Sequence, residues 1–335
     1  MAGIATDFAV LGTGSCVPDR IVSNEEVGAP AGVDGEWIVR KTAIRARRWA
    51  APEQATSDLA VAAGRAALES AGITAGQLSL IVVATSTPDR TQPPTAAYVQ
   101  EQLNAVEAAA FDVNAVCSGS VFALSAAESM LARRGGHALV IGADVYSRIL
   151  DPADRKTVVL FGDGAGAMVL GPADGAGGRG PRARLRHVAL HTFGELSGLI
   201  EVPAGGSRQP MDEAALDAGA QYFAMDGREV RRFVVEQLPQ LTKQFLHEAG
   251  VAPDDIAHFV PHQANGVMLE TVIEDLALPR VTTHLTLETY GNTGAASIPL
   301  TLDAAARRGA FRPGDLILLA GFGGGMAAGF ALLQW

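Results

Sequence analysis

The stretch ESAGITAGQLSLIVVATS, residues 69–86, ends one helical pattern, turns, and enters a buried strand, and the chain repeats this order at HEAGVAPDDIAHFVPHQA, residues 247–264. Ala71 aligns with Ala249, a separation of 178 residues, and the helix end, the turn and the strand then match position by position. A period of this length indicates a duplicated domain, because solenoid repeats are only about 20–50 residues long. We therefore predict two similar halves.

A second pair of segments, further along each half, shares the same order of elements. Residues 129–145, SMLARRGGHALVIGADV, and residues 303–323, DAAARRGAFRPGDLILLAGFG, both carry a helix ending in Ala-Arg-Arg-Gly, then a turn and a buried strand. Between the halves, residues 171–183 are rich in Gly and Pro without an apolar period, which is typical of a linker. The sequence therefore predicts two domains, residues 1–175 and 184–335, with a functional cleft between them.

Helical and strand patterns alternate along the first half. Residues 58–72 and 96–104 have helical patterns, and between them residues 78–86, LSLIVVATS, form an apolar run of strand length. This alternation is typical of an α/β architecture. We therefore expect an α/β fold.

The composition is that of a compact globular protein. Of the 335 residues, 48% are hydrophobic and 19% are charged, and the net charge of -10 disfavours nonspecific nucleic-acid binding. No stretch reaches the roughly 18 apolar residues that span a bilayer, and residues 1–20 lack a basic segment followed by an apolar run. We expect an unprocessed cytoplasmic protein that binds neither membrane nor nucleic acid.

Cysteine and histidine usage limits the chemistry further. Cys16 and Cys117 lie too far apart in the sequence to form a disulfide framework, and the seven histidines have no metal-ligand spacing. We therefore expect no metal ion and no other cofactor.

Cys117 lies in FDVNAVCSGS, residues 111–120, where a strand pattern changes into a long helical pattern. One interpretation is a small buried hydrophobe, which most free cysteines are. The other is a nucleophile at a helix N-terminus, where unpaired N–H groups and the helix dipole favour a thiolate.

Two residues of the second half are candidate partners of Cys117. His262 follows a buried strand, at the strand end where active sites of such sheets collect, and Asn292 lies in a Gly-rich turn before a helix. Taken singly, His262 is more often structural and Asn292 more often a turn residue or helix cap. Together with Cys117 they form a set that can serve a nucleophile with polar helpers.

Six motifs resemble those of β-ketoacyl-acyl-carrier-protein synthase III, a family of thiolase-fold condensing enzymes. In chain order they are EWIVRKTAIRARR (36–48), DVNAVCSG (112–119), DRKTVVLFGDGAGAMVL (154–170), PHQAN (261–265), YGNTGAASIP (290–299) and GFGGGMAAG (321–329). Their order and spacing match the family over essentially the whole chain. The resemblance implies a thiolase-like fold with two duplicated βαβαβαββ halves in five layers, α-β-α-β-α.

The resemblance also implies a reaction, a decarboxylative condensation in fatty-acid or polyketide initiation. Cys117 would take the acyl group of an acyl-CoA, and malonyl on acyl carrier protein would then lose CO₂ and attack it. His262 and Asn292 would donate hydrogen bonds to the enolate oxygen, a task for which positioned donors commonly contribute about 3 kcal/mol each. The backbone N–H groups of Cys117 and Gly324 would form the oxyanion hole.

Coenzyme A binding is implied at four further positions. Trp37 would stack on the adenine, Lys41 and Arg155 would contact the nucleotide, and Asn265 would bond the pantetheine arm. A basic patch on this acidic chain would also suit an acidic carrier protein. The family further implies a homodimer, with residues 91–97 near the partner's acyl pocket.

The chain departs from the family at several places. Ser120 stands where an aromatic residue is usual, Arg228 and Arg231 replace residues that are more often polar-neutral and aromatic, and Lys41 stands where Arg is common. After PHQAN the sequence continues GVM, without the basic residue often found there. The acyl group and the carrier partner are therefore open, and residues 194–210 resemble condensing enzymes of secondary metabolism, such as priming ketosynthases.

Four other classes are alternatives to this one. An acyltransferase would move the acyl group from Cys117 to an acceptor without decarboxylation. A thiolase would need a second catalytic cysteine, whereas Cys16 lies near the N-terminus. A scaffolding homologue would have no use for Cys117, and a cysteine hydrolase would not account for the duplicated halves.

Overall fold

A computed structural model describes residues 8–173 and 183–335 of the chain. Most of the predicted linker, residues 174–182, lies outside the described residues. Residues 1–7, part of the N-terminal segment that we expected to be unprocessed, also lie outside them. The boundary between domains 1–175 and 184–335 therefore stays a prediction.

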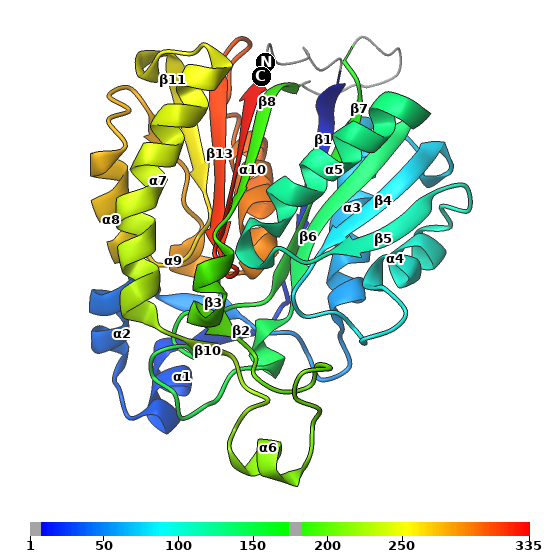
Figure 1. Cartoon of the computed structure of the whole chain (residues 1–335). Coiled ribbons are helices and arrows are strands. Elements are labelled where there is room, and N and C mark those ends of the chain that lie inside the picture. Colours follow the sequence, from blue (N-terminus) through cyan, green and yellow to red (C-terminus); the bar gives the residue numbers. More distant parts are fainter. Residues whose placement is uncertain (1–7, 174–182) are drawn as a thin grey trace.

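The first half contains helices and strands in the alternation predicted from the sequence (Figure 1). Its elements are β1 (Phe8–Cys16), β2 (Ile21–Ser23), α1 (Asn24–Ala31), α2 (Gly35–Thr42), β3 (Ala46–Arg48), α3 (Thr56–Ala71), η1 (Ala75–Gln77), β4 (Leu78–Ala84), α4 (Thr95–Leu103), β5 (Ala109–Val113), η2 (Val116–Ser118), α5 (Gly119–Arg134), β6 (His137–Asp144), η3 (Tyr146–Arg148) and β7 (Gly164–Pro172). The expected helices 58–72 and 96–104 and the expected strand 78–86 are confirmed as α3, α4 and β4.

The second half begins with β8 and ends with the last strand of the chain. Its elements are β8 (Ala183–Thr192), η4 (Gly194–Leu199), β9 (Ile200–Glu201), α6 (Glu213–Asp217), β10 (Ala224–Met225), α7 (Gly227–Ala249), η5 (Pro253–Asp255), β11 (Ile256–Pro261), α8 (Gly266–Asp275), β12 (Thr282–Thr283), α9 (Leu287–Tyr290), η6 (Gly294–Ala296), α10 (Ser297–Arg307), β13 (Leu316–Gly323) and β14 (Ala327–Gln334). The segment that carries α6 extends away from the sheet, at the bottom of Figure 1.

The duplication read from the sequence is confirmed by the positions at which equivalent elements begin. Strands β4 and β11 begin at residues 78 and 256, and helices α5 and α10 begin at residues 119 and 297, each pair 178 residues apart. The short helices η2 and η6, which precede α5 and α10, begin at 116 and 294 with the same separation. The two halves therefore repeat one supersecondary unit.

Ten of the described strands form one mixed sheet in the order β12-β11-β13-β14-β8-β1-β7-β6-β4-β5, and β2 with β3 and β9 with β10 form two small separate sheets. Each half contributes five consecutive strands. The halves join between β1 and β8, where only two residue pairs match, Ala9 with Arg184 and Val10 with Ala183. The strand pairing between the halves is therefore much shorter than the pairing of β1 with β7 or of β8 with β14 within each half.

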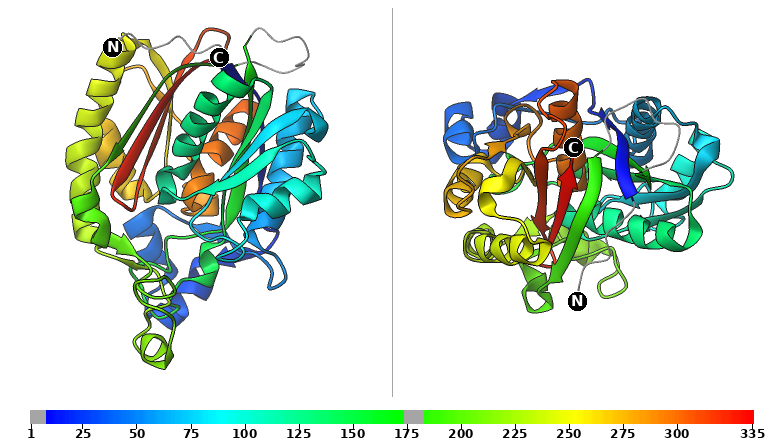
Figure 2. Two further views of the ribbon diagram at one scale, coloured as in Figure 1. Left: turned by 45° about the vertical axis from the view of Figure 1, so that its right-hand side comes forward. Right: turned by 90° about the horizontal axis from the view of Figure 1, so that it is seen from above.

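Helices and half-sheets stack as five layers (Figure 2). Helices α3 and α4 pack on the outer face of the first half-sheet, and α7 and α8 cover the second half. Helices α5 and α10 form the middle layer, because each contacts strands of both halves. Their buried face belongs to one apolar cluster that includes Leu124 and Ile298. The predicted five-layer thiolase-like arrangement is therefore confirmed.

Two strand glycines allow α10 and the turn before it to contact the sheet through backbone atoms. A Cβ atom on Gly142 of β6 would lie 2.1 Å from the carbonyl oxygen of Ala295, and one on Gly166 of β7 would lie 2.3 Å from the N atom of Leu300. Backbone cannot move aside as a side chain can. These contacts therefore fix the position of α10, and with it the turn that carries Asn292.

None of the described helices is long and apolar enough to cross a membrane.

We predict that Gly166→Ala lowers the free energy of unfolding by about 1–3 kcal/mol or more, because the added methyl group meets the α10 backbone. The measurement is the midpoint of chemical unfolding. Gly194→Ala is the matched control, since no heavy atom lies within 4 Å of its added Cβ, and it should change stability by no more than about 0.5 kcal/mol. Equal effects of the two changes would contradict the packing argument.

Candidate active site

Cys117 lies in η2, the short turn between strand β5 and helix α5. Val116, directly before it, has φ 46°, a left-handed conformation that is uncommon for a branched residue and often marks functional turns. The cysteine is 5% exposed. Gly323 of β13 lies against it, because a Cβ there would be 2.7 Å from the Cβ of Cys117. The predicted position at the start of a helix is thus observed.

Burial raises the pKa of the Cys117 thiol to about 12, and the nearby Asp144 carboxylate acts in the same direction. Hydrogen bonds from the Tyr146 hydroxyl and from the backbone N–H of Cys117 lower it only in part. The loss of hydration of a buried sulfur anion is the largest cause of this raised pKa, and it opposes the thiolate that a helix N-terminus favours.

A polar network behind Cys117 was not foreseen from the sequence. The hydroxyl groups of Tyr146 and Ser86 lie 2.8 Å apart, and Asp144 accepts a hydrogen bond of 2.9 Å from the Ser86 N–H. Asp144 also accepts from the hydroxyl of Thr87 at 2.8 Å and from the backbone N–H of Ala295 at 2.7 Å. Burial raises the pKa of Asp144, and these hydrogen bonds oppose the rise. The sequence signal was a strand ending in Asp-Val-Tyr, which alone carries no functional meaning.

His262 follows the last residue of β11, as predicted, and is 2% exposed. Its Nδ1 lies 2.8 Å from the Ser297 hydroxyl. Its ring and that of Phe322 form a T-shaped contact with a centroid distance of 5.2 Å. Burial lowers its pKa to about 3. The imidazole is therefore neutral at physiological pH, and Ser297, which the sequence reasoning missed, orients it.

Asn292 lies between α9 and η6, held by the segment around Phe161. Its N–H donates to the carbonyl of Leu160 at 2.8 Å, and its own carbonyl accepts from Gly162 at 2.9 Å. The side-chain Oδ1 accepts from the Gly294 N–H at 2.9 Å. Because the acceptor end of the amide is engaged in this turn, the Nδ2 donor remains for a ligand.

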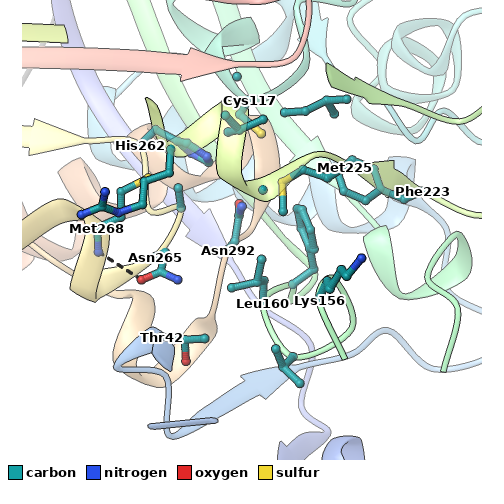
Figure 3. Close-up of a pocket in the computed structure, with 18 of the residues that line it drawn as sticks. Thr42, Cys117, Lys156, Leu160, Phe223, Met225, His262, Asn265, Met268 and Asn292 are labelled. Atoms are coloured by element: carbon teal, nitrogen blue, oxygen red, sulfur yellow. Dashed lines mark hydrogen bonds between the residues drawn. The ribbon is translucent and has the colours of Figure 1, made fainter. Parts of the chain in front are cut away.

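These three side chains line one cavity of about 260 Å³ (Figure 3). Cys117 lies at the far end of the view from Thr42, with His262 and Asn292 between. The structure thus brings together from both halves the three residues that the sequence analysis selected. Their catalytic roles remain proposals.

The four residues expected to bind coenzyme A line the same cavity. They are Trp37, Lys41, Arg155 and Asn265. Asn265 caps α8, because its Oδ1 accepts from the Met268 N–H at 3.2 Å, and its amide donates to the carbonyl of Lys41 at 3.1 Å. This residue therefore joins α2 to α8, and its contact with pantetheine stays a prediction.

The remaining predicted and divergent positions have different surroundings. Gly323 lines the cavity beside Cys117, whereas the atoms nearest to a Cβ on Gly324 belong to Ile200 and Val116, and an oxyanion role for the Gly324 N–H stays a prediction. Ser120 is fully buried in α5, Arg231 lines the cavity, and Arg228 lines the adjoining surface hollow. In the described part of the chain, no group of three His, Cys, Asp or Glu side chains could hold a metal ion.

The chain is similar to known proteins over its whole length. Two family descriptions match, "3-Oxoacyl-[acyl-carrier-protein (ACP)] synthase III" over residues 111–192 and its C-terminal counterpart over residues 246–335. The chain is 73% identical over 328 residues to "Acetoacetyl CoA synthase NphT7" of Streptomyces sp. (strain CL190), with 98% of both chains covered. It is 42% identical to a β-ketoacyl-[acyl-carrier-protein] synthase III of Roseiflexus sp. (strain RS-1), with 99% of both covered.

Solved structures agree with the fold. The 3-oxoacyl-[acyl-carrier-protein] synthase III from Aquifex aeolicus VF5 superposes with a TM-score of 0.86 at 34% identity, covering 98% of this chain and 100% of that one. The priming β-ketosynthase from the R1128 polyketide biosynthetic pathway superposes with a TM-score of 0.88 at 34% identity, covering 100% and 98%. The thiolase-like architecture is therefore shared over the whole chain.

We predict that alkylation of Cys117 by iodoacetamide accelerates about tenfold for each pH unit between pH 7 and pH 9, because only the thiolate reacts and its fraction grows tenfold per unit below the pKa. The alkylation rate rises with pH because the raised pKa of Cys117 leaves little thiolate at neutral pH. Intact mass of a Cys16→Ser variant reports the rate without interference from the second thiol. A rate that is already constant between these pH values would show a preformed thiolate and contradict the argument.

Proposed function

Because the chain belongs to the 3-oxoacyl-[acyl-carrier-protein] synthase III family of condensing enzymes, we propose that it makes acetoacetyl-CoA from acetyl-CoA and malonyl-CoA with loss of CO₂. The observation that carries this choice is the 73% identity to a protein named acetoacetyl CoA synthase. The sequence analysis favoured malonyl-acyl carrier protein as the second substrate. That substrate is the alternative, and it is supported by the family descriptions that name the carrier protein.

In the first step, the sulfur of Cys117 attacks the carbonyl carbon of acetyl-CoA. The bond between that carbon and the CoA sulfur breaks, and the thiol proton passes to the leaving CoA thiolate. The pKa of about 12 means that little free thiolate exists beforehand. Proton loss therefore accompanies attack, and backbone N–H groups of the oxyanion hole, at Cys117 and Gly324, hold the negative oxygen.

In the second step, the carboxylate of the malonyl thioester leaves as CO₂, and its bonding electrons form an enolate. The enolate carbon attacks the acetyl group on Cys117, and the Cys117 thiolate leaves and takes a proton from solvent. The sum consumes one acetyl-CoA, one malonyl-CoA and one proton, and yields acetoacetyl-CoA, CoA and CO₂. Atoms and charges balance without any other reactant.

His262 and Asn292 suit the enolate because both are uncharged donors. In the tautomer that we propose, the Ser297 hydroxyl donates to Nδ1 of His262, and Nε2 carries the proton that faces the substrate. Neutral donors strengthen as charge develops on the thioester oxygen, whereas a cation here would also hold the malonyl carboxylate in the ground state. The pKa of about 3 for His262 is consistent with this role.

Three packed aromatic rings favour a small primer. Tyr146 stacks on Phe161 at a centroid distance of 4.4 Å, and Phe223 meets Phe161 edge to face at 4.9 Å. Phe161 and Phe223 line the cavity, and the Tyr146 hydroxyl bonds Cys117. A long acyl chain on Cys117 would have to displace this cluster, so acetyl is the primer that we propose.

We predict that wild-type protein gains the acetyl mass from acetyl-CoA and loses it to product when malonyl-CoA is added. Cys117→Ala should gain no mass, because the nucleophile is gone. Asn292→Ala removes one enolate donor, so condensation should slow about a hundredfold or more while acetylation is largely retained. The measurement is intact mass from a panel of acyl-CoAs, together with release of labelled CO₂.

Several outcomes would change the assignment. Acetylation without malonyl-dependent discharge would favour a simple acyltransferase, the alternative left open by the sequence. Equal loss of acetylation and CO₂ release in Asn292→Ala would contradict the division of labour between the two steps. Exclusive use of malonyl-acyl carrier protein would return the assignment to the carrier-dependent reaction.

We further predict a homodimer in a cytoplasmic setting. Strand β5 lies at one edge of the sheet, with none of its residues fully buried, so a second copy could extend the sheet there. Residues 91–97 precede or begin α4, the helix next to β5. Sedimentation at micromolar concentration should give twice the chain mass, and a monomer would contradict this prediction.

A further inference from the structure

The open part of the catalytic cavity is lined by four cationic side chains from three places in the sequence. Lys41 belongs to α2, Arg155 and Lys156 to the segment after η3, and Arg231 to α7. All four are exposed. In Figure 3, Lys156 lies away from Cys117, beyond Leu160 and Asn292. Negative charge entering this cavity therefore meets the cations before it reaches the thiol.

None of the four cations forms a salt bridge within 4.0 Å in the part of the chain that the structure describes. The ion pairs there join other residues, and on α7 it is Arg232, not Arg231, that pairs with Glu229. The neighbouring Asp226 is engaged as the N-cap of α7. Several unpaired cations around one cavity create a positive potential that attracts an anionic ligand.

Helix α8, which begins at the cavity, has an acidic exposed face. Helix α8 begins at the cavity with Asn265 as its cap, and its exposed residues include Val267, Glu270, Glu274 and Asp275. The helix carries no Lys or Arg. An acidic protein that docked over α8 would meet these carboxylates, and like charges at an interface disfavour association.

Four cations in one cavity favour a ligand with several phosphates over a ligand with one. Coenzyme A carries a pyrophosphate and a further phosphate on its ribose, whereas a carrier-protein arm carries one phosphodiester. Lys41 and Arg155 are the pair that the family resemblance assigns to the nucleotide. Lys156 and Arg231 are additional, and Arg231 stands at a position that is more often aromatic in the family.

We propose that Lys156 and Arg231 bind the phosphates at the nucleotide end of CoA thioesters and make the enzyme select them over carrier-protein thioesters; this inference rests on the proposed condensation. Arg231 offers a planar fork that can bond two phosphate oxygens, and Lys156 adds a point charge. Because one cavity serves both steps, the pair acts on acetyl-CoA as well as on malonyl-CoA.

The test compares malonyl-CoA with malonyl-pantetheine, which has the same reacting end and no phosphate. Enzyme is first acetylated on Cys117 with saturating acetyl-CoA and desalted, so that a single turnover reports the second step alone. Wild type should prefer malonyl-CoA. In Arg231→Ala and in Lys156→Ala that preference, the ratio of second-order rate constants, should fall about tenfold, the loss expected for one charge-assisted phosphate contact.

Arg232→Ala is the matched control, because it removes the same charge from the adjacent residue of α7 and lies outside the cavity lining. It should leave the preference unchanged, whereas Arg231→Lys should retain part of it. Equal losses in Arg231→Ala and Arg232→Ala would show a general charge effect and overturn the proposal. An unchanged ratio in both Arg231→Ala and Lys156→Ala would overturn it as well.

A malonyl-loaded bacterial acyl carrier protein provides the remaining arm. Wild type should use it less efficiently than malonyl-CoA, and faster use of the carrier protein would overturn the selection that we propose. Exclusive use of the carrier protein would reject both this selection and malonyl-CoA as the substrate of the proposed function. Failure of the condensation itself looks different. In that case no malonyl thioester, malonyl-pantetheine included, would release CO₂ from acetylated wild type, whereas CO₂ release with an unaltered preference in the variants rejects only the role of Lys156 and Arg231.

Discussion

The buried carboxylate of Asp144 is the constraint on which the site depends, because it joins the two halves of the chain behind Cys117. It accepts hydrogen bonds from Ser86 and Thr87 of the first half and, at 2.7 Å, from the N–H of Ala295 of the second. Leaving a buried carboxylate without partners would cost several kcal/mol, so these partners cannot readily separate. Ala295 lies three residues after Asn292, and the network therefore holds the turn that carries the asparagine against the first half of the chain.

This construction gives a site whose resting groups are neutral. Burial moves the pKa of Cys117 up to about 12 and that of His262 down to about 3, so a thiolate-imidazolium pair is strongly disfavoured. A neutral site suits a reaction in which negative charge appears only briefly, first on a tetrahedral oxygen and then on an enolate. Fixed N–H donors in a dry cavity stabilise such charge without reorganising. Cationic groups are kept at the cavity opening, where they can act on a ligand's phosphates.

Periodicity and motifs in the sequence predicted much of the molecule. The 178-residue repeat anticipated equivalent starts of β4 and β11 and of α5 and α10, because apolar patterns and turn residues are local signals. The motifs also selected Cys117, His262 and Asn292, which the fold brings to one cavity. Tyr146 and Ser297 were missed, since their importance comes from contacts between distant segments. The raised pKa of Cys117 was missed for a related reason: a helix terminus can be read from the sequence, but the degree of burial that opposes a thiolate there cannot.

The duplication also explains why the chain has one such site instead of two. At a separation of 178 residues, Cys117 corresponds to Ala295 and His262 corresponds to Ala84, while Asn292 corresponds to Asn114. The two alanines lie beside Gly119 at the start of α5. If Gly119 carried a Cβ atom, that atom would lie 3.2 Å from the Cβ of Ala84 and 3.5 Å from the Cβ of Ala295. Both alanines are fully buried, so a cysteine or an imidazole in their place would have to displace its neighbours. The close packing that holds the middle helices together thus occupies the place of a second site, and the symmetry of the fold is broken where the chemistry requires one nucleophile.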